Sequence, residues 1–361
     1  MDAIQLIEYI LTWLVFALLP FCACTTLIVL LERIAEPLGI TDKPTERKQH
    51  TGEIPLIGGL AIYGSFLVSL GLLTTELDYL PMLALGALLV VTGYIDDRLD
   101  LSAKLRLVVQ ITASLGMIYI SGISIVSVGD LVGSGPILLP TFISVLFTVM
   151  CTVGVVNAIN MSDGLDGLAG GLLTISFSAI FFLLWLSDLF DLAKLTLILI
   201  GSTLAFLCFN SRIFLVRAKI FLGDSGSMFL GFMLCWILIE GSQDPNNAIS
   251  PVAAGWIFGV PLIDTMSVIV GRLLKGQSPL KPGRDHLHHL LLDAGIVYRK
   301  TVLLMISAHT FFVSVGVFII FNPIYEPYLF WFFVVLVLGN HFIVKQFLTD
   351  SIRSQGASLR D

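Results

Sequence analysis

Carboxylate-rich turns stand beside apolar stretches at three places in the sequence. The first turn holds Asp96 and Asp97, the second holds Asp163 and Asp166, and the third holds Asp224. Carboxylates are costly to bring into hydrocarbon, so three such turns at the edges of apolar stretches need a reason. Each turn taken alone could be a helix cap or a solvated loop. Together they predict a divalent metal and a phosphate handled at a membrane surface.

The first turn combines adjacent acids with nearby cations. Asp96 and Asp97 could hold Mg²⁺ through oxygen ligands or accept a proton. Lys104 and Arg106 follow within ten residues and could hold phosphate oxygens. Taken alone, the pattern fits equally well a solvated turn in which Asp100 or Ser102 caps the next helix. The two other acidic turns on the same face favour phosphate chemistry.

The second turn is rich in carboxamides as well as acids. Asn157 and Asn160 precede Asp163 and Asp166, and the two acids share a face if the turn is helical. One acid would be enough for helix capping and dipole compensation. The excess of polar side chains therefore indicates a polar pocket.

The third turn, Gly223–Gly226, opens an apolar segment. Small residues and free backbone N–H groups at a helix start can bind a phosphate, and Asp224 could coordinate a metal that bridges it. An aspartate N-cap would explain the same pattern. Phe221 could stack on a base, although aromatic residues are also common at membrane interfaces.

Histidines gather in one basic loop. His286, His288 and His289 fall within four residues, and such a tract could bind zinc, donate to phosphate or shuttle protons. No cysteine accompanies the tract, which favours phosphate contact over zinc. Lys48 and His50 precede another apolar stretch, where they could meet an anionic substrate or anionic lipid headgroups.

The composition predicts an all-α integral membrane protein. Of 361 residues, 56% are hydrophobic and 13% are charged, and the mean hydropathy is +0.94, which excludes an ordinary soluble globule. A span needs roughly 20 apolar residues. By this measure we expect about eleven spans, near 6–31, 56–73, 79–95, 104–120, 138–158, 168–187, 193–208, 226–240, 251–272, 302–321 and 327–347. No basic leader precedes the first span, which predicts an anchor and not a cleaved signal peptide.

The basic residues predict the orientation. Every Lys and Arg except Lys194 lies on one side if the spans alternate, and basic loops stay in the cytoplasm. The N-terminus is then periplasmic and the C-terminus cytoplasmic. We expect a single polytopic domain, residues 1–361, and no nucleic-acid partner. Its predicted active-site loops, all cytoplasmic, are 32–55, 96–103, 159–167, 209–225 and 273–301.

The ordered set of motifs resembles the polyprenyl-phosphate N-acetylhexosamine-1-phosphate transferase family. The resemblance runs from Asp42 to about residue 295 and includes all three acid-rich turns and the histidine tract. The peptidoglycan branch of the family has three consecutive histidines, whereas this chain reads His286-Leu287-His288-His289. The tract is instead similar to the branch that moves N-acetylglucosamine-1-phosphate, as in O-antigen and enterobacterial common antigen initiation.

The resemblance implies a reaction between UDP-N-acetylglucosamine and undecaprenyl phosphate in the bacterial inner membrane. The products are undecaprenyl-diphospho-N-acetylglucosamine and UMP. The implied cofactor is Mg²⁺, which Mn²⁺ could replace, and the resemblance is compatible with a homodimer. Direct attack by the lipid phosphate is favoured, while a two-step route through an aspartyl intermediate stays open.

The resemblance also implies roles for individual residues. Asp224 and Asn160 are the expected metal ligands, and the expected catalytic residues are Asp96, Asp97, Asp163 and Asp166. Asp96 is expected to deprotonate or orient the lipid phosphate. The lipid tail is expected to follow a groove opened by a bend at Pro261. The expected substrate-binding residues are Lys48, His50, Lys104, Arg106, Asn157, Asn210, Phe221, Arg272, His286, His288 and His289.

Two other classes of protein fit part of the pattern. Membrane aromatic prenyltransferases bind prenyl diphosphates with aspartate-rich turns and Mg²⁺, as the run from Asp96 to Asp100 would, but lack the Asp224 turn and the histidine tract. A secondary transporter would carry charges along a path through the bilayer. Here Asp264 is the one carboxylate expected deep in a span, where it marks a functional interior or a polar helix contact.

Overall fold

The protein is almost entirely helical, as its composition predicts. A computed structural model describes residues 3–37, 39–42, 52–74, 77–213, 215–245, 248–278 and 283–346. The chain divides into two compact units. Unit 1 comprises Met1–Ile125 and Thr141–Ala248, and unit 2 comprises Val126–Pro140 and Ile249–Asp361.

Unit 1 is a helical bundle with one very short antiparallel sheet. The strands β1 (Thr41–Asp42) and β2 (Ile54–Pro55) pair with Thr41 opposite Pro55, and the turn η1 (Leu77–Tyr79) leads into α3. The helices of this unit are α1 (Ala3–Ala35), α2 (Gly58–Leu73), α3 (Leu80–Leu99), α4 (Ala103–Ser121), α5 (Thr141–Ser162), α6 (Leu168–Leu186), α7 (Phe190–Asn210) and α8 (Gly223–Gln243).

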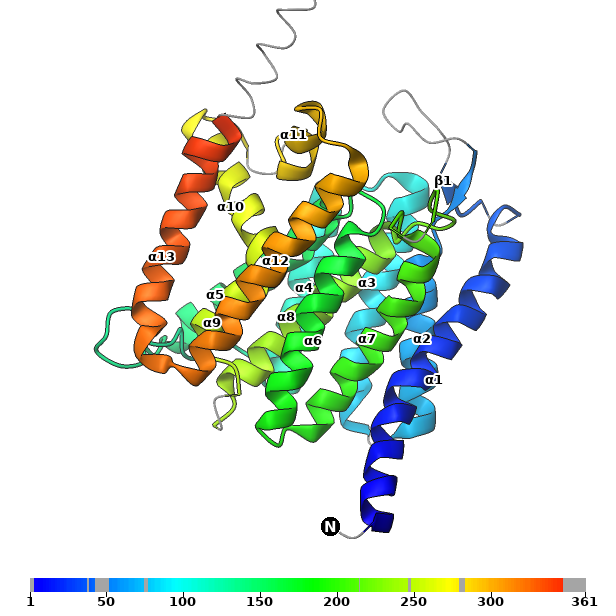
Figure 1. The fold of residues 1–361 in the computed structure, drawn as a ribbon, viewed down its shortest axis with the longest axis horizontal. Helices are drawn as coiled ribbons and strands as arrows, with labels where there is room; N and C mark the ends of the chain where they lie inside the picture. Colours follow the sequence, from blue (N-terminus) through cyan, green and yellow to red (C-terminus); the bar gives the residue numbers. More distant parts are fainter. Residues whose placement is uncertain are drawn as a thin grey trace, which may run out of the picture. The chain divides into compact units, whose positions relative to one another are not determined.

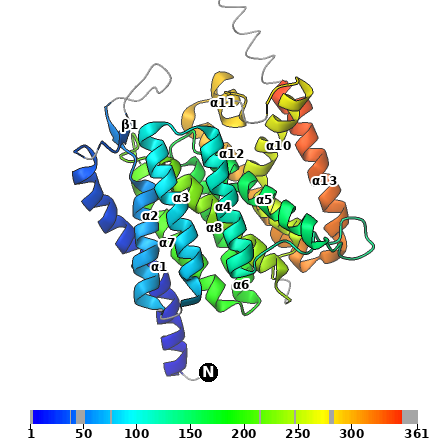
Figure 2. The ribbon, with the colours of Figure 1, turned by 180° about the vertical axis from the view of Figure 1, so that it is seen from behind.

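The core of unit 1 is α8, which is buried along nearly its whole length. It packs against α2, α3, α5, α6 and α7. Figure 1 shows α6 and α7 nearer the viewer than α3 and α4, and the view from behind in Figure 2 reverses this order. Close approach is possible because α8 is rich in small residues: Gly226 lies against Gly59 of α2, and Gly231 lies against Val156 of α5.

Unit 2 contains the remaining helices and the 126–140 segment. Trp256 of α9 packs against Phe312 of α12 and Phe333 of α13, which forms an aromatic core. The indole N–H of Trp331 donates to the Leu131 carbonyl at 3.1 Å and ties the 126–140 segment to α13. The elements are α9 (Pro251–Ile257), α10 (Gly259–Leu274), α11 (Leu287–Asp293), α12 (Tyr298–Phe321), η2 (Pro323–Tyr325), α13 (Glu326–Gly339) and the π-helix η3 (Asn340–Lys345).

Each of the eleven predicted spans coincides with a helix or a pair of consecutive helical segments. Among the described residues, nine helices are long and apolar enough to cross a membrane, and the pair α9–α10 passes the same test together. The remaining predicted span is α2, which has only 16 residues. The helical membrane architecture is therefore confirmed, whereas the side on which each terminus lies stays a prediction.

The bend in the ninth predicted span does not lie at Pro261, as the sequence analysis expects. The chain turns by 88° between α9 and α10, with Phe258 at the joint. Pro261 lies in the first turn of α10, where its missing N–H removes no intrahelical hydrogen bond. The proline therefore begins a new helix just after the break.

Candidate active site

The three acid-rich turns come together at one end of unit 1. α3 and α5 end there, and α8 begins there. Asp97 at the end of α3 binds the first turn of α8, and Asn160 near the end of α5 binds Asp224. Motifs far apart in the sequence are thereby brought into one group of carboxylates. The aspartate cluster, as we name it, consists of Asp96, Asp97, Asp163, Asp166 and Asp224.

Asp97 caps the N-terminus of α8. Its Oδ1 accepts a hydrogen bond from the Asp224 N–H at 2.9 Å, and its Oδ2 accepts one from the Ser225 N–H at 3.5 Å. A carboxylate is stabilised at this position by the positive end of the helix dipole. Of the N–H groups that the sequence analysis expects to bind phosphate, those of Asp224 and Ser225 thus contact Asp97 in this structure, and phosphate binding at the turn stays a prediction. Asp97 fixes the backbone that carries Asp224.

Asp224 and Asn160, the two predicted metal ligands, are in direct contact. The Asn160 amide donates to Asp224 Oδ1 and also to Ser227 Oγ, the latter at 2.9 Å. An asparagine amide has an NH₂ group and an oxygen of similar shape, so the same side chain can present either one. Asp224 is part-exposed, with 28% of its side chain accessible. These two residues could therefore supply oxygen ligands to a cation at the rim of the cluster.

Arg106 links two carboxylates of the cluster. Its Nη1 atom lies 2.9 Å from Asp96 Oδ2 and 3.7 Å from Asp224 Oδ2. The other oxygen of Asp96 accepts the Leu101 N–H at 2.7 Å, which closes the turn between α3 and α4. Asp96 is buried; its Oδ1 accepts the Leu101 N–H, and its Oδ2 faces Arg106 in the ion pair. Its direct effect is to hold Arg106 in place.

The turn between α5 and α6 is held from the end of α7. Asn210 is buried; its side-chain oxygen accepts the Gly167 N–H at 2.7 Å, and its NH₂ group donates to the Ile220 carbonyl at 2.9 Å. Gly167 adopts φ 84°, which favours glycine. Arg212 forms an ion pair with Asp166 in the same turn. Asn210 therefore positions Asp166, and a substrate contact for Asn210 stays a prediction.

The aspartate cluster carries more negative than positive charge. Burial raises the pKa of Asp163 well above its usual value, and the charges of Asp224, Asp166 and Asp97 raise it further. Among the cluster's ion pairs, the cations are Arg106 and Arg212. The described residues contain no group of three or more His, Cys, Asp or Glu side chains arranged to hold a metal. This donor set still fits Mg²⁺, which proteins usually bind through one or two carboxylates together with substrate phosphates and water.

Several other predicted residues lie around the cluster. Lys104 is exposed at the start of α4, and the Asn157 amide donates to Gln110 of α4 at 2.7 Å. The Phe221 N–H donates to the Pro55 carbonyl at 2.8 Å, and the Phe221 carbonyl accepts the Gly58 N–H at 3.0 Å. Lys48 and His50 lie outside the described residues. The segment before α2 and the turn before α8 are thus joined along their backbones.

Two glycines allow the helices around α8 to approach closely. A Cβ atom on Gly93 of α3 would collide with the backbone of Ser225, and one on Gly59 of α2 would collide with that of Gly226. Backbone cannot move aside as the end of a flexible side chain can. These glycines therefore set the distance from α2 and α3 to the turn that carries Asp224.

Gly93→Ala is expected to destabilise the protein, because the added methyl group must push α3 away from α8. We expect the free energy of unfolding to fall by about 1–3 kcal/mol. Gly154→Ala in α5 is the matched control, since a Cβ there has nothing within 4 Å. Thermal unfolding in detergent would compare the two variants. Equal melting temperatures would contradict close packing at Gly93.

In unit 2, the histidine tract is anchored on α10. Asp264 Oδ2 lies 2.8 Å from His286 Nδ1, and its Oδ1 accepts the Leu287 N–H at 2.9 Å. Arg272 binds Asp285 through Nε at 3.1 Å and Nη2 at 2.7 Å. Partial burial raises the pKa of Asp285, but the hydrogen bond and charge of Arg272 outweigh this and lower it overall. Asp264 therefore makes polar contacts that hold the histidine loop at the start of α11. This fits the polar helix contact, one of the two roles expected for it.

The three histidine rings contact one another in sequence order, His286 stacked on His288 and His289 tilted against His288. The ring centroids of His286 and His288 are 6.1 Å apart, and those of His288 and His289 are 4.1 Å apart. His286 and His288 are buried, whereas His289 is half-buried. Burial, then the charges of Arg284 and His286, lower the pKa of His289, which favours its neutral form. A neutral His289 could donate one hydrogen bond to an anionic ligand.

Asp264→Ala is expected to release the start of α11, because it removes the acceptor for the Leu287 N–H and the partner of His286. Amide hydrogen exchange over residues 286–291 should become faster, as in a locally opened segment. Asp293→Ala is the control, since its ion pair with Arg284 is exposed. Unchanged exchange in Asp264→Ala would show that α11 is held by other contacts.

Comparison with known proteins assigns the family. The family model described as Glycosyl transferase family 4 matches residues 79–242. The undecaprenyl-phosphate alpha-N-acetylglucosaminyl 1-phosphate transferase of Escherichia coli strain K12 is 36% identical over 298 residues, which cover 82% of this chain and 81% of that protein. The chain belongs to glycosyl transferase family 4.

Two further relatives carry the same printed name. The protein of Yersinia pestis is 35% identical over 286 residues, which cover 79% of this chain and 78% of the relative. The protein of Haemophilus influenzae strain Rd is 35% identical over 300 residues, which cover 82% of this chain and 83% of the relative. The residues matched by the glycosyl transferase family 4 model include the whole aspartate cluster and end before α9.

The structure of this family 4 member adds residues that the sequence analysis does not single out. Arg212 pairs with Asp166, Asp285 pairs with Arg272, and Ser227 accepts from Asn160. A weak sequence signal exists for each, since every one of them lies within three residues of a predicted site residue. Gln110, which binds Asn157, has no such signal, because it lies in the middle of an apolar span.

Proposed function

We propose that the protein transfers N-acetylglucosamine-1-phosphate from UDP-N-acetylglucosamine to undecaprenyl phosphate. The products would be undecaprenyl-diphospho-N-acetylglucosamine and UMP. The printed names of relatives that are 35% to 36% identical over 79% to 82% of this chain support the reaction. The structural observation that carries it is the meeting of Asp97, Asn160 and Asp224 at the start of α8.

The proposed step is a direct displacement at phosphorus. An oxygen of the lipid phosphate bonds to the sugar-bearing phosphorus, while the bond from that phosphorus to the bridging oxygen breaks and UMP leaves with that oxygen. An ionised phosphate is already a competent nucleophile, so the protein has little covalent chemistry to perform. The main tasks are to offset the repulsion between two anions and to align them.

The residues around Asp224 suit these tasks. Asp224 and Asn160 would hold Mg²⁺, which Mn²⁺ could replace, and the excess of carboxylates over arginines in the cluster favours a cation there. When bound, the metal supplies positive charge next to the diphosphate oxygens. Asp97 orients Asp224 through the first N–H groups of α8. Asp96 would orient the lipid phosphate through Arg106, which it holds at 2.9 Å.

The other proposed contacts follow the roles expected for each motif. Asp163, Asp166 and Phe221 would border the uridine, and Arg212 steadies Asp166. His288 and His289 would contact the diphosphate and the sugar. Arg272 acts at least in part by holding Asp285 in the histidine loop. The proposed setting is the bacterial inner membrane, at the first step of a lipid-linked surface glycan such as O-antigen or enterobacterial common antigen.

A panel of donors tests the proposed substrate. The purified protein would be incubated with undecaprenyl phosphate, Mg²⁺ and one of three nucleotide-sugar donors. The lipid products would be identified and quantified by mass spectrometry. We expect product with UDP-N-acetylglucosamine and little with UDP-N-acetylgalactosamine or UDP-N-acetylmuramoyl-pentapeptide. A larger yield with either of the latter two would overturn the assigned sugar while keeping the chemistry.

A further inference from the structure

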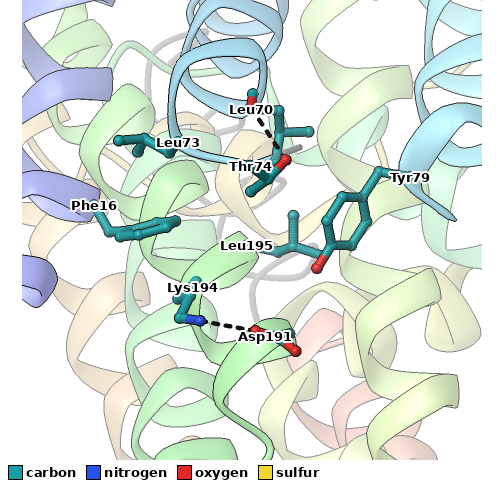
Figure 3. Close-up of a pocket in the computed structure, with 8 residues that line it drawn as sticks. All are labelled: Phe16, Leu70, Leu73, Thr74, Tyr79, Asp191, Lys194 and Leu195. Carbon is teal, nitrogen blue, oxygen red and sulfur yellow. Dashed lines mark hydrogen bonds and ion pairs between the residues drawn. The ribbon is translucent and has the colours of Figure 1, made fainter. Parts of the chain in front are cut away.

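Two adjoining cavities lie at the end of unit 1 opposite the aspartate cluster. They measure about 160 Å³ and about 240 Å³ and share Asp191. A water molecule takes roughly 30 Å³ of liquid volume, so each cavity has room for several heavy atoms. The first is lined by Phe16, Leu70, Leu73, Thr74, Tyr79, Asp191, Lys194 and Leu195 (Figure 3). The second is lined by Asp188, Leu189, Phe190, Asp191, Leu192, Glu240 and Asp244.

These cavities lie at the level expected for lipid headgroups. α7 runs from Phe190 at the cavities to Asn210 at the aspartate cluster, and its 21 residues span about 30 Å, close to the thickness of the hydrocarbon layer. The Trp185 indole donates to the Tyr9 hydroxyl at 2.7 Å, and the ring of Trp13 packs against Phe190. Tryptophan and tyrosine concentrate at membrane–water interfaces. The aromatic pairs therefore mark this end of α7 as an interface.

Lys194 is a candidate anion-binding residue at this end of α7. It is the one basic residue that the predicted orientation places on the outer face, and it lies one turn into α7. Its ammonium binds Asp191 at 2.8 Å and lies 5.8 Å from the centre of the Phe16 ring. An ammonium has three N–H donors, so Lys194 could bind a phosphate oxygen without releasing Asp191.

The charges around Lys194 select a ligand that carries both signs. Asp191 lies beside Lys194, and Asp188, Glu240 and Asp244 line the adjoining cavity. A simple anion would meet these carboxylates, and a simple cation would meet Lys194. A phosphate joined to a primary ammonium by two carbons could place its negative charge at Lys194 and its positive charge at the carboxylates. Figure 3 shows the apolar side chains Phe16, Leu73 and Leu195 around Lys194, where glycerol and the first methylenes of a lipid would lie.

We infer that these cavities bind the headgroup of an aminophospholipid, with its phosphate at Lys194 and its ammonium at the carboxylates of Asp191 and Glu240. The site lies about 30 Å from the aspartate cluster and does not depend on the proposed transferase reaction. Its occupant would tie α1, α2 and α7 together at the outer face of unit 1.

Native mass spectrometry of delipidated protein would test this site. The full-length protein in detergent would be titrated with phosphatidylethanolamine, phosphatidylglycerol, phosphatidylcholine and water-soluble glycerophosphoethanolamine. We expect phosphatidylethanolamine to bind most tightly, since phosphatidylglycerol has no ammonium and the choline group has no N–H. Lys194→Gln should weaken its binding about tenfold, as the loss of a charge-assisted hydrogen bond does. Lys300→Gln, an exposed cation in unit 2, should leave it unchanged.

A second variant distinguishes a lost binding site from a folding defect. Asp191→Asn leaves Lys194 without its acidic partner, so it should shift the preference toward phosphatidylglycerol, a gain that misfolded protein would not make. Equal binding of phosphatidylethanolamine by the wild type and Lys194→Gln would overturn the inference, and so would a wild-type preference for phosphatidylglycerol. If glycerophosphoethanolamine binds as tightly as phosphatidylethanolamine, the lipid tails add nothing. The ligand would then be a water-soluble phosphoamine, and the inference of a lipid site would be overturned.

Discussion

Asp224→Asn is expected to lose almost all metal-dependent turnover while the protein stays folded. Removal of a charged metal ligand should lower kcat by about a thousandfold, because several kcal/mol of charge stabilisation are lost. Stability should be unchanged or higher, since one of the charges that repel Asp163 disappears. The measurement is UMP release at saturating substrates and a range of Mg²⁺ concentrations, together with thermal unfolding of the same preparation.

Asp293→Asn is the matched control for this change, because Asp293 forms an exposed ion pair outside the aspartate cluster. It should keep wild-type turnover. Wild-type activity in Asp224→Asn would remove Asp224 from the metal site. A large fall in melting temperature would show instead that its carboxylate is mainly structural.

Asp97→Asn is expected to lower turnover about a hundredfold, as the loss of a residue that orients a metal ligand does. Asparagine can still accept the Asp224 N–H, but its NH₂ group would then face the Ser225 N–H, which needs an acceptor. The first turn of α8 should loosen and the Asp224 carboxylate should shift. The free energy of unfolding should fall by about 1 kcal/mol, as for a lost helix cap.

The dependence on metal concentration separates this positioning role from a merely structural one. Excess Mg²⁺ should partly restore Asp97→Asn but not Asp224→Asn, since only the former keeps the charged ligand. Asp100→Asn is the control in the same turn; Asp100 has φ 51°, a conformation that asparagine tolerates well. A loss in Asp97→Asn that no Mg²⁺ concentration changes would contradict its positioning of Asp224.

The sequence was sufficient to locate the helices because a membrane span needs a long apolar run. Each predicted span found a helix, including the short α2. The joint at Phe258 could not be predicted in the same way, because the residues on both sides of it are equally apolar. Pro261 pointed to the correct neighbourhood, but a proline can begin a helix as readily as it can bend one. The local sequence therefore predicts that this span is interrupted, but not that the interruption lies at Phe258.

The members of the site could also be predicted, but their pairings could not. Polar residues beside apolar spans are conspicuous, so the sequence predicts that Asp97, Asn160 and Asp224 take part in the chemistry. That Asp97 caps α8 depends on the close approach of α3 to α8 at Gly93, a packing detail that local patterns do not encode. Likewise, Asp264 was visible as a costly buried acid, whereas its partner His286 lies 22 residues away in a loop.

UMP release by the purified protein tests the central claim most directly. Complete reactions would contain undecaprenyl phosphate, UDP-N-acetylglucosamine and Mg²⁺, and parallel reactions would omit the lipid or chelate the metal. We expect release in the complete reaction alone, with one undecaprenyl-diphospho-N-acetylglucosamine formed for each UMP. Release that continues without the lipid, or no release by folded protein in the complete mixture, would contradict a metal-dependent sugar-phosphate transfer to undecaprenyl phosphate.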